Sequence, residues 1–391
     1  MGKGDRKTGD NMRIGIDIRP IVSKGTGVGS YTLNLIKNIG TLDHKNSYIL
    51  FSNSFKDRIS LESLHLPLNF NLKDYRVPNR ILRGLWNYFS YPPIESFIGD
   101  VDIFHSPHSI PIPARKAKLI VTIHDLFFLK HPDMVDWNVR KDHKRLTNAY
   151  LSKVRKIITV SNNSKKDILE LLDVNPNIIT VIYEGVDNIF RVINDRAYLD
   201  NIRKKYKLPH EFILFIGTVS PRKNSNGIIK AISILRKRGL KDIFLIMIGP
   251  KGWRADETFR LISENNLDES VKHLGYVPYE DMPYIYNISR LLVYPSLYEG
   301  FGLPPLEAMA CGIPVISSNI SSMPEILGDS ALLVDPYNPH EIADSIERLL
   351  YDESLRNTFI EKGQERTHLY SWENTAKKVL EVYNEVVKEN E

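Results

Sequence analysis

The sequence predicts an α/β protein with two successive domains, each a doubly wound parallel sheet covered by helices. Three observations support this prediction. The chain has 391 residues, which is too long for one ordinary hydrophobic core. Its 42% hydrophobic and 25% charged residues are typical of a globular protein. Strand-like and helix-like segments alternate along most of the chain, which is the βα rhythm of parallel sheets.

Apolar, β-favouring runs give six predicted strands in each half. In the first half they are Arg13–Asp17, Tyr48–Ser52, Val101–His105, Leu119–His124, Ile157–Ser161 and Ile179–Tyr183. In the second half they are Phe212–Gly217, Ile243–Gly249, Val271–Leu274, Leu291–Tyr294, Pro314–Ser317 and Ala331–Val334. Helical patterns lie between most of them, for example at Gly29–Gly40, Ser164–Leu172, Asn226–Arg238 and His340–Tyr351. Two such domains are expected to face a central cleft, since ligands of these sheets bind at strand carboxyl ends.

Domain boundaries follow from this alternation. We expect a first domain over residues 12–190 and a second over residues 205–372, joined by a charged, helix-prone link. Residues 1–11 are polar and glycine-rich, so a disordered leader is expected. The C-terminal segment Ser371–Val387 is amphipathic, with apolar side chains placed to pack.

Composition excludes several classes of protein. The single cysteine, Cys311, rules out an intrachain disulfide and fits a reducing compartment. No run approaches the roughly 18 to 20 apolar residues of a membrane span, and no signal peptide heads the chain, so we expect a cytoplasmic protein. Nucleic acid is disfavoured as a partner, because no basic-aromatic module is visible.

Charge is shared unevenly between the two halves. Residues 1–190 carry 27 Lys and Arg against 19 Asp and Glu, or +8, and the remainder carries 25 against 28, or −3. The basic first half could favour an anionic acceptor or a membrane surface. A solvated basic surface is an equally good interpretation.

The stretch Tyr294–Gly312, YPSLYEGFGLPPLEAMACG, carries the most specific chemistry. A buried strand is predicted to end at its start, and the Pro-Pro pair suits the first turn of a helix. The Gly-Phe-Gly turn lets backbone approach a ligand, and the helix N-terminus attracts phosphate. Glu299 and Glu307, on either side of the turn, can each accept hydrogen bonds from a vicinal diol. Phosphate and diols together describe a nucleotide sugar; the alternative is a capped helix with two surface glutamates.

Polar residues also follow two predicted strands of the first half. Lys24–Tyr31 reads KGTGVGSY, and its glycines, Gly27 among them, would bring backbone close to something flat or anionic. A plain tight turn explains this segment equally well. In VTIHDLF, His124 leaves a buried strand where imidazole can donate to a sugar hydroxyl or act on a proton, and Asp125 is expected to orient the loop. The alternative is a structural histidine.

A third polar pair follows the first strand of the second half. There GTVSPRKN places Arg222 and Lys223 in a turn directly before a helix. A guanidinium and an ammonium side by side can neutralise a diphosphate leaving group. The alternative is two adjacent surface cations. Taken with the other strand ends, the pair completes a coherent polar set on both sides of the expected cleft.

These residues resemble the retaining glycosyltransferases of family 4, which have the two-domain GT-B architecture. The resemblance covers nearly everything from Met12 to about Val387 and is most specific over Tyr294–Pro336, where Glu299 and Glu307 form the family's E-x7-E element. The motifs GTGVGSY, VTIHDLF, VSNNSKKDI, VIYEGVD and SPRKN also match. Among subgroups, the chain is most similar to bacterial mannosyltransferases that build O-antigens and other surface polysaccharides from GDP-mannose.

The resemblance implies a role for each matching position. Glu307 would hold the donor ribose, Glu299 would contact donor-sugar hydroxyls, and His124 would touch the sugar near its reacting face. The other implied contacts are to phosphate, sugar and base, from Gly27, Arg222, Lys223, Val277, Phe301, Gly302 and Leu303. The chain departs from the family at Thr218, where many relatives carry a basic residue. That departure places more of the phosphate charge on the Arg-Lys pair.

The implied reaction is metal-independent, retaining transfer of a hexose, most plausibly mannose from GDP-mannose, onto a glycan or lipid-linked glycan. No cofactor is implied beyond the nucleotide sugar. Front-face attack is favoured over a Glu299 nucleophile, which as a sugar ligand would lie too far from the anomeric carbon. The alternatives are a UDP-sugar donor such as UDP-glucose, a sugar-nucleotide epimerase of the same architecture, and a silent binding subunit. Family architecture also implies that the C-terminal helix, residues 373–391, packs back on the first domain.

The acceptor side is expected to lie on first-domain loops. The stretch 76–98 combines aromatic residues with arginines: Trp86, Tyr88, Phe89, Tyr91, Phe97, Arg76, Arg80 and Arg83. Exposed aromatics beside basic residues would suit a lipid-diphosphate-linked glycan at an anionic membrane surface. The alternative is that the aromatics belong to the core and the arginines are solvated.

Overall fold

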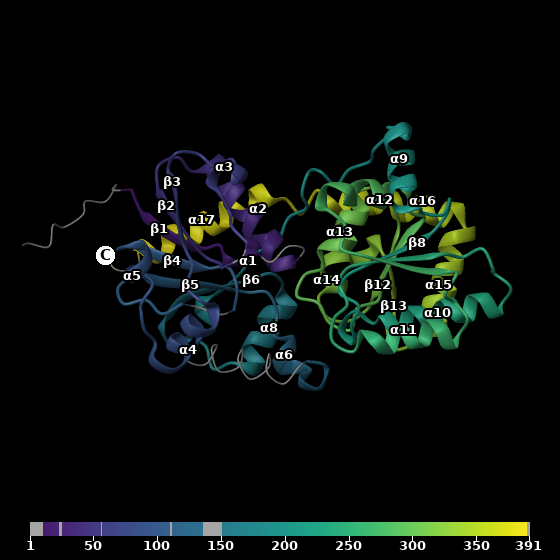
Figure 1. Cartoon of the computed structure of the whole chain (residues 1–391), viewed down its shortest axis with the longest axis horizontal. Helices are drawn as coiled ribbons and strands as arrows, with labels where there is room; N and C mark the ends of the chain where they lie inside the picture. The colour runs from purple at the N-terminus through teal and green to yellow at the C-terminus, as the bar shows by residue number, and fades with distance from the viewer. Residues whose placement is uncertain (1–10, 23–25, 56, 110–111, 136–150, 389–391) are drawn as a thin grey trace, which may run out of the picture.

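The computed structural model describes residues 11–22, 26–55, 57–109, 112–135 and 151–388, and these form two α/β lobes side by side (Figure 1). Most of the predicted leader, residues 1–10, lies outside the described residues, as do Lys24 and Gly25 of the glycine-rich loop. Each lobe is one parallel sheet with helices on both faces. The predicted fold class is therefore confirmed.

The first lobe contains a seven-stranded sheet in the order β3-β2-β1-β4-β5-β6-β7. Its strands are β1 Arg13–Asp17, β2 Ser47–Asn53, β3 Phe70–Tyr75, β4 Ile103–Ser106, β5 Lys118–Ile123, β6 Val154–Thr159 and β7 Ile179–Val181. The edge strand β3 was not predicted. Only its first residue, Phe70, is buried, so the strand lacks the apolar run that marks the central strands.

The second lobe contains a six-stranded sheet in the order β10-β9-β8-β11-β12-β13. Its strands are β8 Ile213–Ile216, β9 Leu245–Ile248, β10 Val271–Gly275, β11 Leu291–Tyr294, β12 Val315–Ser318 and β13 Leu332–Val334. Each pairs with its neighbours in parallel. All six were predicted. Four of them, β8, β9, β11 and β12, are short apolar runs that are buried along most or all of their length, whereas β10 and β13 have one buried residue each.

Helices cover both faces of the two sheets. In the first lobe they are α1 Arg19–Val22, α2 Gly27–Leu42, α3 Leu61–Leu64, α4 Asn79–Phe89, α5 Glu95–Ile98, α6 Phe127–Lys130, η1 Pro132–Met134, η2 Leu151–Lys153, α8 Asn162–Leu171 and η3 Pro176–Ile178. In the second they are α9 Arg196–Tyr206, η4 Pro221–Lys223, α10 Ser225–Lys237, α11 Ala255–Glu264, η5 Tyr279–Asp281, α12 Met282–Ile288, α13 Leu303–Ala310, α14 Met323–Leu327, η6 Gly328–Ser330, α15 Pro339–Tyr351 and α16 Glu353–Thr367.

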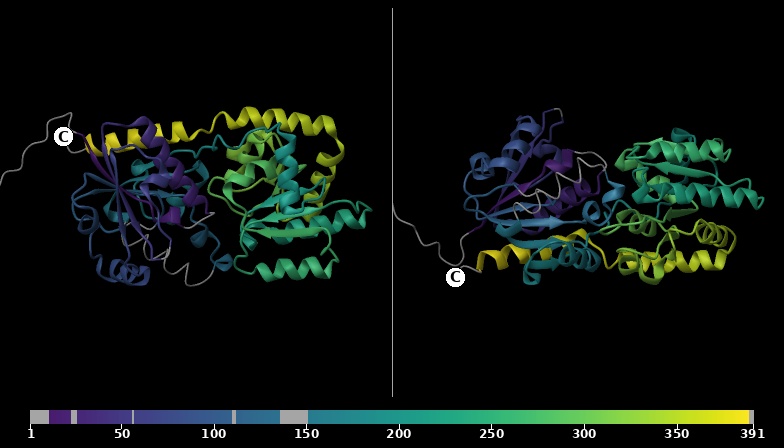
Figure 2. Two further views of the ribbon diagram at one scale, coloured as in Figure 1. Left: turned by 45° about the horizontal axis from the view of Figure 1, so that its top comes forward. Right: turned by 90° about the horizontal axis from the view of Figure 1, so that it is seen from below.

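The last helix, α17 Trp372–Lys388, leaves the second lobe and runs along the first (Figure 2). It packs against α2 and β6, and its Tyr383 hydroxyl lies 2.7 Å from His105 Nδ1. Where the chain crosses back, Ser371 forms a parallel bridge with Val186 of the outgoing segment. The two crossings between the lobes therefore lie side by side.

Candidate active site

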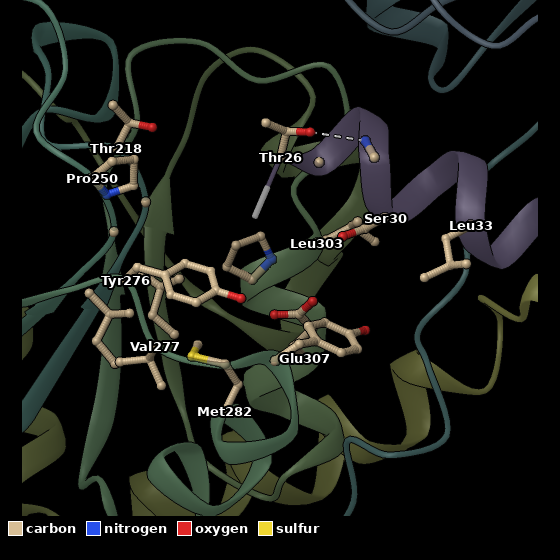
Figure 3. A pocket seen from close by; sticks show the side chains of 18 of the residues that line it. Thr26, Ser30, Leu33, Thr218, Pro250, Tyr276, Val277, Met282, Leu303 and Glu307 are labelled. Carbon is tan, nitrogen blue, oxygen red and sulfur yellow. Dashed lines mark hydrogen bonds between the residues drawn. The ribbon is translucent and has the colours of Figure 1, made fainter. Parts of the chain in front are cut away.

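A cavity of about 430 Å³ lies between the lobes at the carboxyl ends of both sheets. Thr26 and Ser30 border it from the first lobe, Tyr276 and Val277 border it from the second, and Glu307 lies between them (Figure 3). The remaining lining residues are Ile21, Gly27, Gly29, Leu33, Asn34, Phe190, Ile216, Gly217, Thr218, Ile248, Gly249, Pro250, Tyr279, Met282, Leu303 and Pro304. Four of the predicted site residues, Gly27, Val277, Leu303 and Glu307, thus border one space.

The first-lobe side of the cavity is the N-terminus of α2. Thr26 caps this helix, and its Oγ1 accepts a hydrogen bond from the Gly29 amide at 3.1 Å. The helix begins at Gly27, two residues earlier than predicted, so both glycines belong to its first turn. A Cβ on Gly27 would meet nothing within 4 Å, so backbone at a positive helix end is open toward the cavity.

The second-lobe side is built around Glu307 on α13. Its Oε2 accepts a hydrogen bond of 2.7 Å from the hydroxyl of Tyr286, a fully buried residue of α12. Burial raises the pKa of Glu307 to about 7, and the Tyr286 hydrogen bond only partly opposes that rise. This carboxylate therefore gains its charge near neutral pH, where it can accept hydrogen bonds from two adjacent hydroxyls.

The turn before α13 brings backbone to the same space. Gly302 caps the helix with φ of 104°, a conformation that favours glycine, and a Cβ there would lie 2.4 Å from Met323 Cε. Prolines occupy the first turn of α13, where a missing N–H costs nothing. Leu303 and Pro304 line the cavity, so the positive end of α13 faces it.

Glu299 lies in a compact charge cluster beside this cavity. Its side chain is buried, with Oε1 2.5 Å from Lys223 Nζ and 2.8 Å from the Tyr294 hydroxyl. Arg222 Nη2 lies 3.4 Å from Glu299 Oε2 and 2.8 Å from Asp125 Oδ2 of the first lobe. The cluster joins predicted site residues from two segments, and Asp125 links it across the lobes.

The pKa values of Glu299 and Lys223 are shifted by burial and by the neighbouring charges. Burial by itself would raise the pKa of Glu299, but the charges of Lys223 and Arg222 outweigh burial and lower it. Burial lowers the pKa of Lys223, against the opposing charge of Glu299. The stem of Lys223 lies 3.5 Å from the point where a Gly217 side chain would begin, and Gly217 lines the cavity. Lys223 therefore lies directly behind the cavity wall at Gly217, and the other charged groups of the cluster follow from it.

His124, which was predicted to touch the donor sugar, forms two hydrogen bonds within the first lobe. Both ring nitrogens are occupied: Nδ1 lies 3.0 Å from Glu184 Oε1, and Nε2 lies 3.1 Å from the Pro107 carbonyl. Burial would lower the pKa of His124, but the hydrogen bond and charge of Glu184 raise it. The imidazole can reach a substrate only by giving up one of these two partners. Its role toward a sugar stays a prediction.

Phe301 is buried, and its ring packs against Tyr183 and Tyr370 rather than toward the cavity. Only the backbone of Phe301 can therefore contact a ligand in the cavity. Asp125 orients its loop as expected, because Oδ1 accepts from the Phe127 amide at 3.0 Å. Its second role, the ion pair with Arg222, was missed.

Three hydrogen-bond partners of predicted site residues were not predicted from the sequence. Tyr286, Tyr294 and Glu184 each hold one predicted site residue. Tyr294 and Glu184 stand inside motifs that were recognised, so their position was a usable signal. Tyr286 lies in a helix with no such motif, and only the tertiary fold brings it to Glu307.

Two features are absent from the described part of the chain. No group of three or more His, Cys, Asp or Glu there is arranged to hold a metal ion. Among the same residues, no helix is both long and apolar enough to cross a membrane. Cys311, the single cysteine, has a free and buried thiol, and burial raises the pKa of that thiol.

Comparison with known families decides the classification. Residues 25–188 match the family described as Glycosyltransferase Family 4, and residues 200–366 match Glycosyl transferases group 1. The chain is 32% identical to an O-antigen chain mannosyltransferase B of Escherichia coli, over 95% of this chain and 99% of that protein. The chain belongs to glycosyltransferase family 4.

Two further likenesses agree with this family. The chain is 29% identical to the serotype-specific mannosyltransferase WbdA of Escherichia coli over 73% of its own length, and the match spans 36% of WbdA. Its fold matches a sucrose-phosphate synthase from Thermosynechococcus elongatus with a TM-score of 0.77 at 19% identity, covering 96% of this chain and 99% of the other. The two facing lobes are thus the GT-B architecture. Family 4 enzymes are retaining hexosyltransferases that use nucleotide-sugar donors.

Proposed function

We propose that this family 4 enzyme transfers mannose from GDP-mannose, with retention, onto a glycan or lipid-linked glycan in surface polysaccharide synthesis. The observation that carries the proposal is the cavity itself. It brings a diol-binding carboxylate, Glu307, together with the open N-terminus of α2 and the first turn of α13, and Lys223 lies behind its wall at Gly217. The choice of mannose rests on the two relatives that are mannosyltransferases.

In this proposal the nucleotide lies along the second lobe. The base lies near Val277, and Glu307 accepts hydrogen bonds from the ribose diol. The diphosphate lies between the first turn of α2 at Gly27 and the cation pair. Amides of the turn at Phe301, Gly302 and Leu303 then reach the sugar and the distal phosphate. The positions of charged groups support this placement of the diphosphate, because Gly27 opens the positive end of α2 to the cavity and Lys223 lies behind the cavity wall at Gly217.

Chemistry then follows from leaving-group stabilisation. The acceptor oxygen attacks the anomeric carbon on the face from which the diphosphate departs. The bond between that carbon and the phosphate oxygen breaks, and the acceptor proton passes to a phosphate oxygen. Arg222 and Lys223 stabilise the negative charge that develops on the departing diphosphate. GDP and the mannosylated acceptor are the products.

Double displacement through Glu299 is less well supported. Both oxygens of this carboxylate already have cationic partners, and the Tyr294 hydroxyl donates to one of them. The lowered pKa that results weakens a carboxylate as a nucleophile. Glu299 is better suited to accept hydrogen bonds from donor-sugar hydroxyls while keeping the two cations in place.

A donor panel tests the proposed function. The purified enzyme is incubated with GDP-mannose, UDP-glucose and matched GDP- and UDP-sugars, and free nucleotide and sugar are followed. We expect slow hydrolysis of GDP-mannose above the other donors. Faster hydrolysis of a UDP-sugar would show that the donor is that UDP-sugar and not GDP-mannose. Formation of an isomer or glycal would indicate an epimerase. Binding without turnover of any donor would indicate a silent subunit.

We also propose that the enzyme works in the cytoplasm at an anionic membrane surface, through α4 and the residues around it. Of the five aromatics in the stretch 76–98, Trp86 and Phe97 pack in the first-lobe core. Tyr88, Phe89 and Tyr91 are instead 67%, 72% and 64% exposed. Three arginines in the same stretch, Arg76, Arg80 and Arg83, are exposed too. Exposed aromatics beside basic side chains favour a headgroup surface.

Flotation with vesicles tests this surface. We expect the enzyme to float with phosphatidylglycerol vesicles at low salt and much less with phosphatidylcholine vesicles. Replacing Phe89 and Tyr91 by Ser should reduce flotation, whereas the same replacement of exposed Tyr351 on the second lobe should not. No flotation of the unmodified enzyme at low salt would remove the membrane from the proposal and leave the donor assignment intact.

A further inference from the structure

The Glu299 turn, Tyr298–Gly302, is held on its own lobe by two serines that precede α14. Ser321 Oγ lies 2.7 Å from the Glu299 carbonyl and 3.0 Å from the Glu299 amide. Ser322 Oγ lies 3.0 Å from the same carbonyl, and Ser322 is the N-cap residue of α14. The position of this turn therefore depends on the position of the start of α14.

The first lobe holds the same turn from the opposite side. Ser161, the N-cap residue of α8, donates a hydrogen bond of 2.7 Å from Oγ to the Gly300 carbonyl. Ser164, in the first turn of α8, donates to the His124 carbonyl at 2.9 Å. Gly300 lies so close to His124 that a Cβ there would be 2.1 Å from the His124 carbonyl oxygen. One helix end thus contacts both the Glu299 turn and the His124 loop.

Glu325 connects these two supports. It lies on α14, and its carboxylate accepts hydrogen bonds from four first-lobe groups. Oε1 lies 2.8 Å from the Asn162 amide, 2.9 Å from Asn162 Nδ2 and 2.9 Å from the Tyr183 hydroxyl, and Oε2 lies 3.0 Å from the Asn163 amide. The two amides belong to the first turn of α8, where they have no partner within the helix and the helix dipole favours an anion.

We propose that Glu325 is a positioning residue for glycosyl transfer, docking α14 on the N-terminus of α8 and so holding the Glu299 turn against the His124 loop. Without this carboxylate, α14 and its two serines are free to move relative to α8. The turn would then shift away from the first lobe. Glu307 and Val277, which contact the nucleotide in the proposed function, belong to the second lobe alone and would keep their positions.

The test compares Glu325→Ala with Asp329→Ala. Asp329 is an exposed carboxylate beside the end of α14 that pairs at 2.7 Å with Lys362 of its own lobe, so its loss leaves the docking contact intact. For Glu325→Ala we expect GDP-mannose hydrolysis to fall about 100-fold, as displacements of roughly 1 Å can cause. GDP affinity by calorimetry should fall far less than the rate, because Glu307 and Val277 keep their positions and only the phosphate contacts of the turn and of Gly27 weaken. The radius of gyration by X-ray scattering should increase. Asp329→Ala should match the unmodified enzyme in all three measurements.

Glu325→Gln adds a graded variant if the alanine variant does not fold. Its amide oxygen can still accept from Asn162, but its NH₂ group cannot accept from the Asn163 amide, so an intermediate rate is expected. Wild-type hydrolysis with an unchanged radius of gyration in Glu325→Ala would overturn the proposal. The inference rests on the proposed donor only for the rate. If the unmodified enzyme neither binds GDP nor hydrolyses GDP-mannose, that donor is wrong, and the radius of gyration alone decides whether Glu325 docks the lobes.

Discussion

Glu299 and Glu307 lie eight residues apart in one stretch, yet the fold gives them opposite surroundings. Glu299 is 5% exposed and has Lys223, Arg222 and Tyr294 around its oxygens. Those charges lower its pKa. Glu307 lines the cavity, accepts a hydrogen bond from Tyr286 and forms no ion pair with the residues that the structure describes, and burial raises its pKa to about 7.

The difference shows that spacing in a motif does not fix the charge state of its members. Both carboxylates flank the same turn and helix, but only Glu299 is reached by the cations of η4. One carboxylate therefore carries a constant negative charge that organises the cluster. The other changes its charge within the physiological range, so ligand binding at Glu307 is expected to depend on pH.

The largest effect is expected from removing the cation nearest to Glu299. Lys223→Ala should lower GDP release from GDP-mannose by about 10²- to 10³-fold, because a charge-stabilising group at the leaving diphosphate is lost. Arg222 keeps a cation beside Glu299, so the variant should fold. Lys362→Ala, which removes a surface ion pair of the same lobe, is the matched control. Near wild-type turnover in Lys223→Ala would contradict the phosphate assignment.

The next largest difference is expected in stability, where substitution of Glu299 should cost more than substitution of Glu307. Glu299→Ala leaves Lys223, only 18% exposed, without its carboxylate and should lower the free energy of unfolding by roughly 3 kcal/mol. Glu307→Gln keeps an acceptor for Tyr286 and leaves no cation unpaired, so its loss should be much smaller. Urea unfolding at pH 7 measures both. Equal losses would mean that the two carboxylates are not distinguished by their surroundings.

The contributions of Glu307 and Glu299 to stability should change with pH in opposite directions, and Glu307 should also make GDP binding depend on pH. Below about pH 7 the free enzyme holds a proton on Glu307, which must leave before the carboxylate can accept from both ribose hydroxyls. The Kd for GDP should therefore rise about tenfold per pH unit below 7. Because folding raises the pKa of Glu307 from 4.5 to about 7, its contribution to the free energy of unfolding declines as the pH rises from 4.5 to 7. Folding lowers the pKa of Glu299, so the contribution of Glu299 declines as the pH falls. Calorimetry between pH 5.5 and 8.5 checks the affinity, and Glu307→Gln should keep only the dependence that the terminal phosphate of GDP contributes by its own titration at about pH 6.

A smaller effect is expected at Thr218, the departure from the family pattern. This residue lines the cavity beside the cluster, so Thr218→Lys would add a cation near the expected diphosphate. We expect GDP to bind several-fold more tightly, by about 1 kcal/mol, and the gain to shrink as salt is added. Thr218→Gln adds a side chain without charge and should show no salt-dependent gain. An equal gain in both variants would indicate packing rather than charge.

Much of the fold could be predicted because its strands are short apolar runs. Central strands such as β11 have every residue buried, and that property is written directly in the sequence. The edge strand β3 could not be found this way, since one of its faces is solvated and only Phe70 is buried. The start of α2 was set two residues late because Gly27 is a poor helix former, whereas the Thr26 cap decides the boundary.

Several residues of the candidate site could be proposed from the sequence, but the hydrogen bonds and ion pairs between distant segments could not. Residues at strand ends identified Glu299, Arg222, Lys223 and Glu307, because parallel strands deliver their loops to one edge. The motif VIYEGVD marked Glu184 as a candidate neighbour of the site, but no local pattern shows that it pairs with His124, 60 residues away. The docking of Glu325 on Asn162 joins positions 163 residues apart. Such contacts arise from the packing of whole elements, which no local pattern records.

A crystal structure of the enzyme with intact GDP-mannose tests the central contrast most directly. The account predicts the ribose hydroxyls within hydrogen-bond distance of the Glu307 carboxylate, and the diphosphate in contact with Lys223 and Arg222. Glu299 should face donor-sugar hydroxyls and keep its contact with Lys223. A ribose bound away from Glu307, or a diphosphate that touches neither cation, would contradict the account.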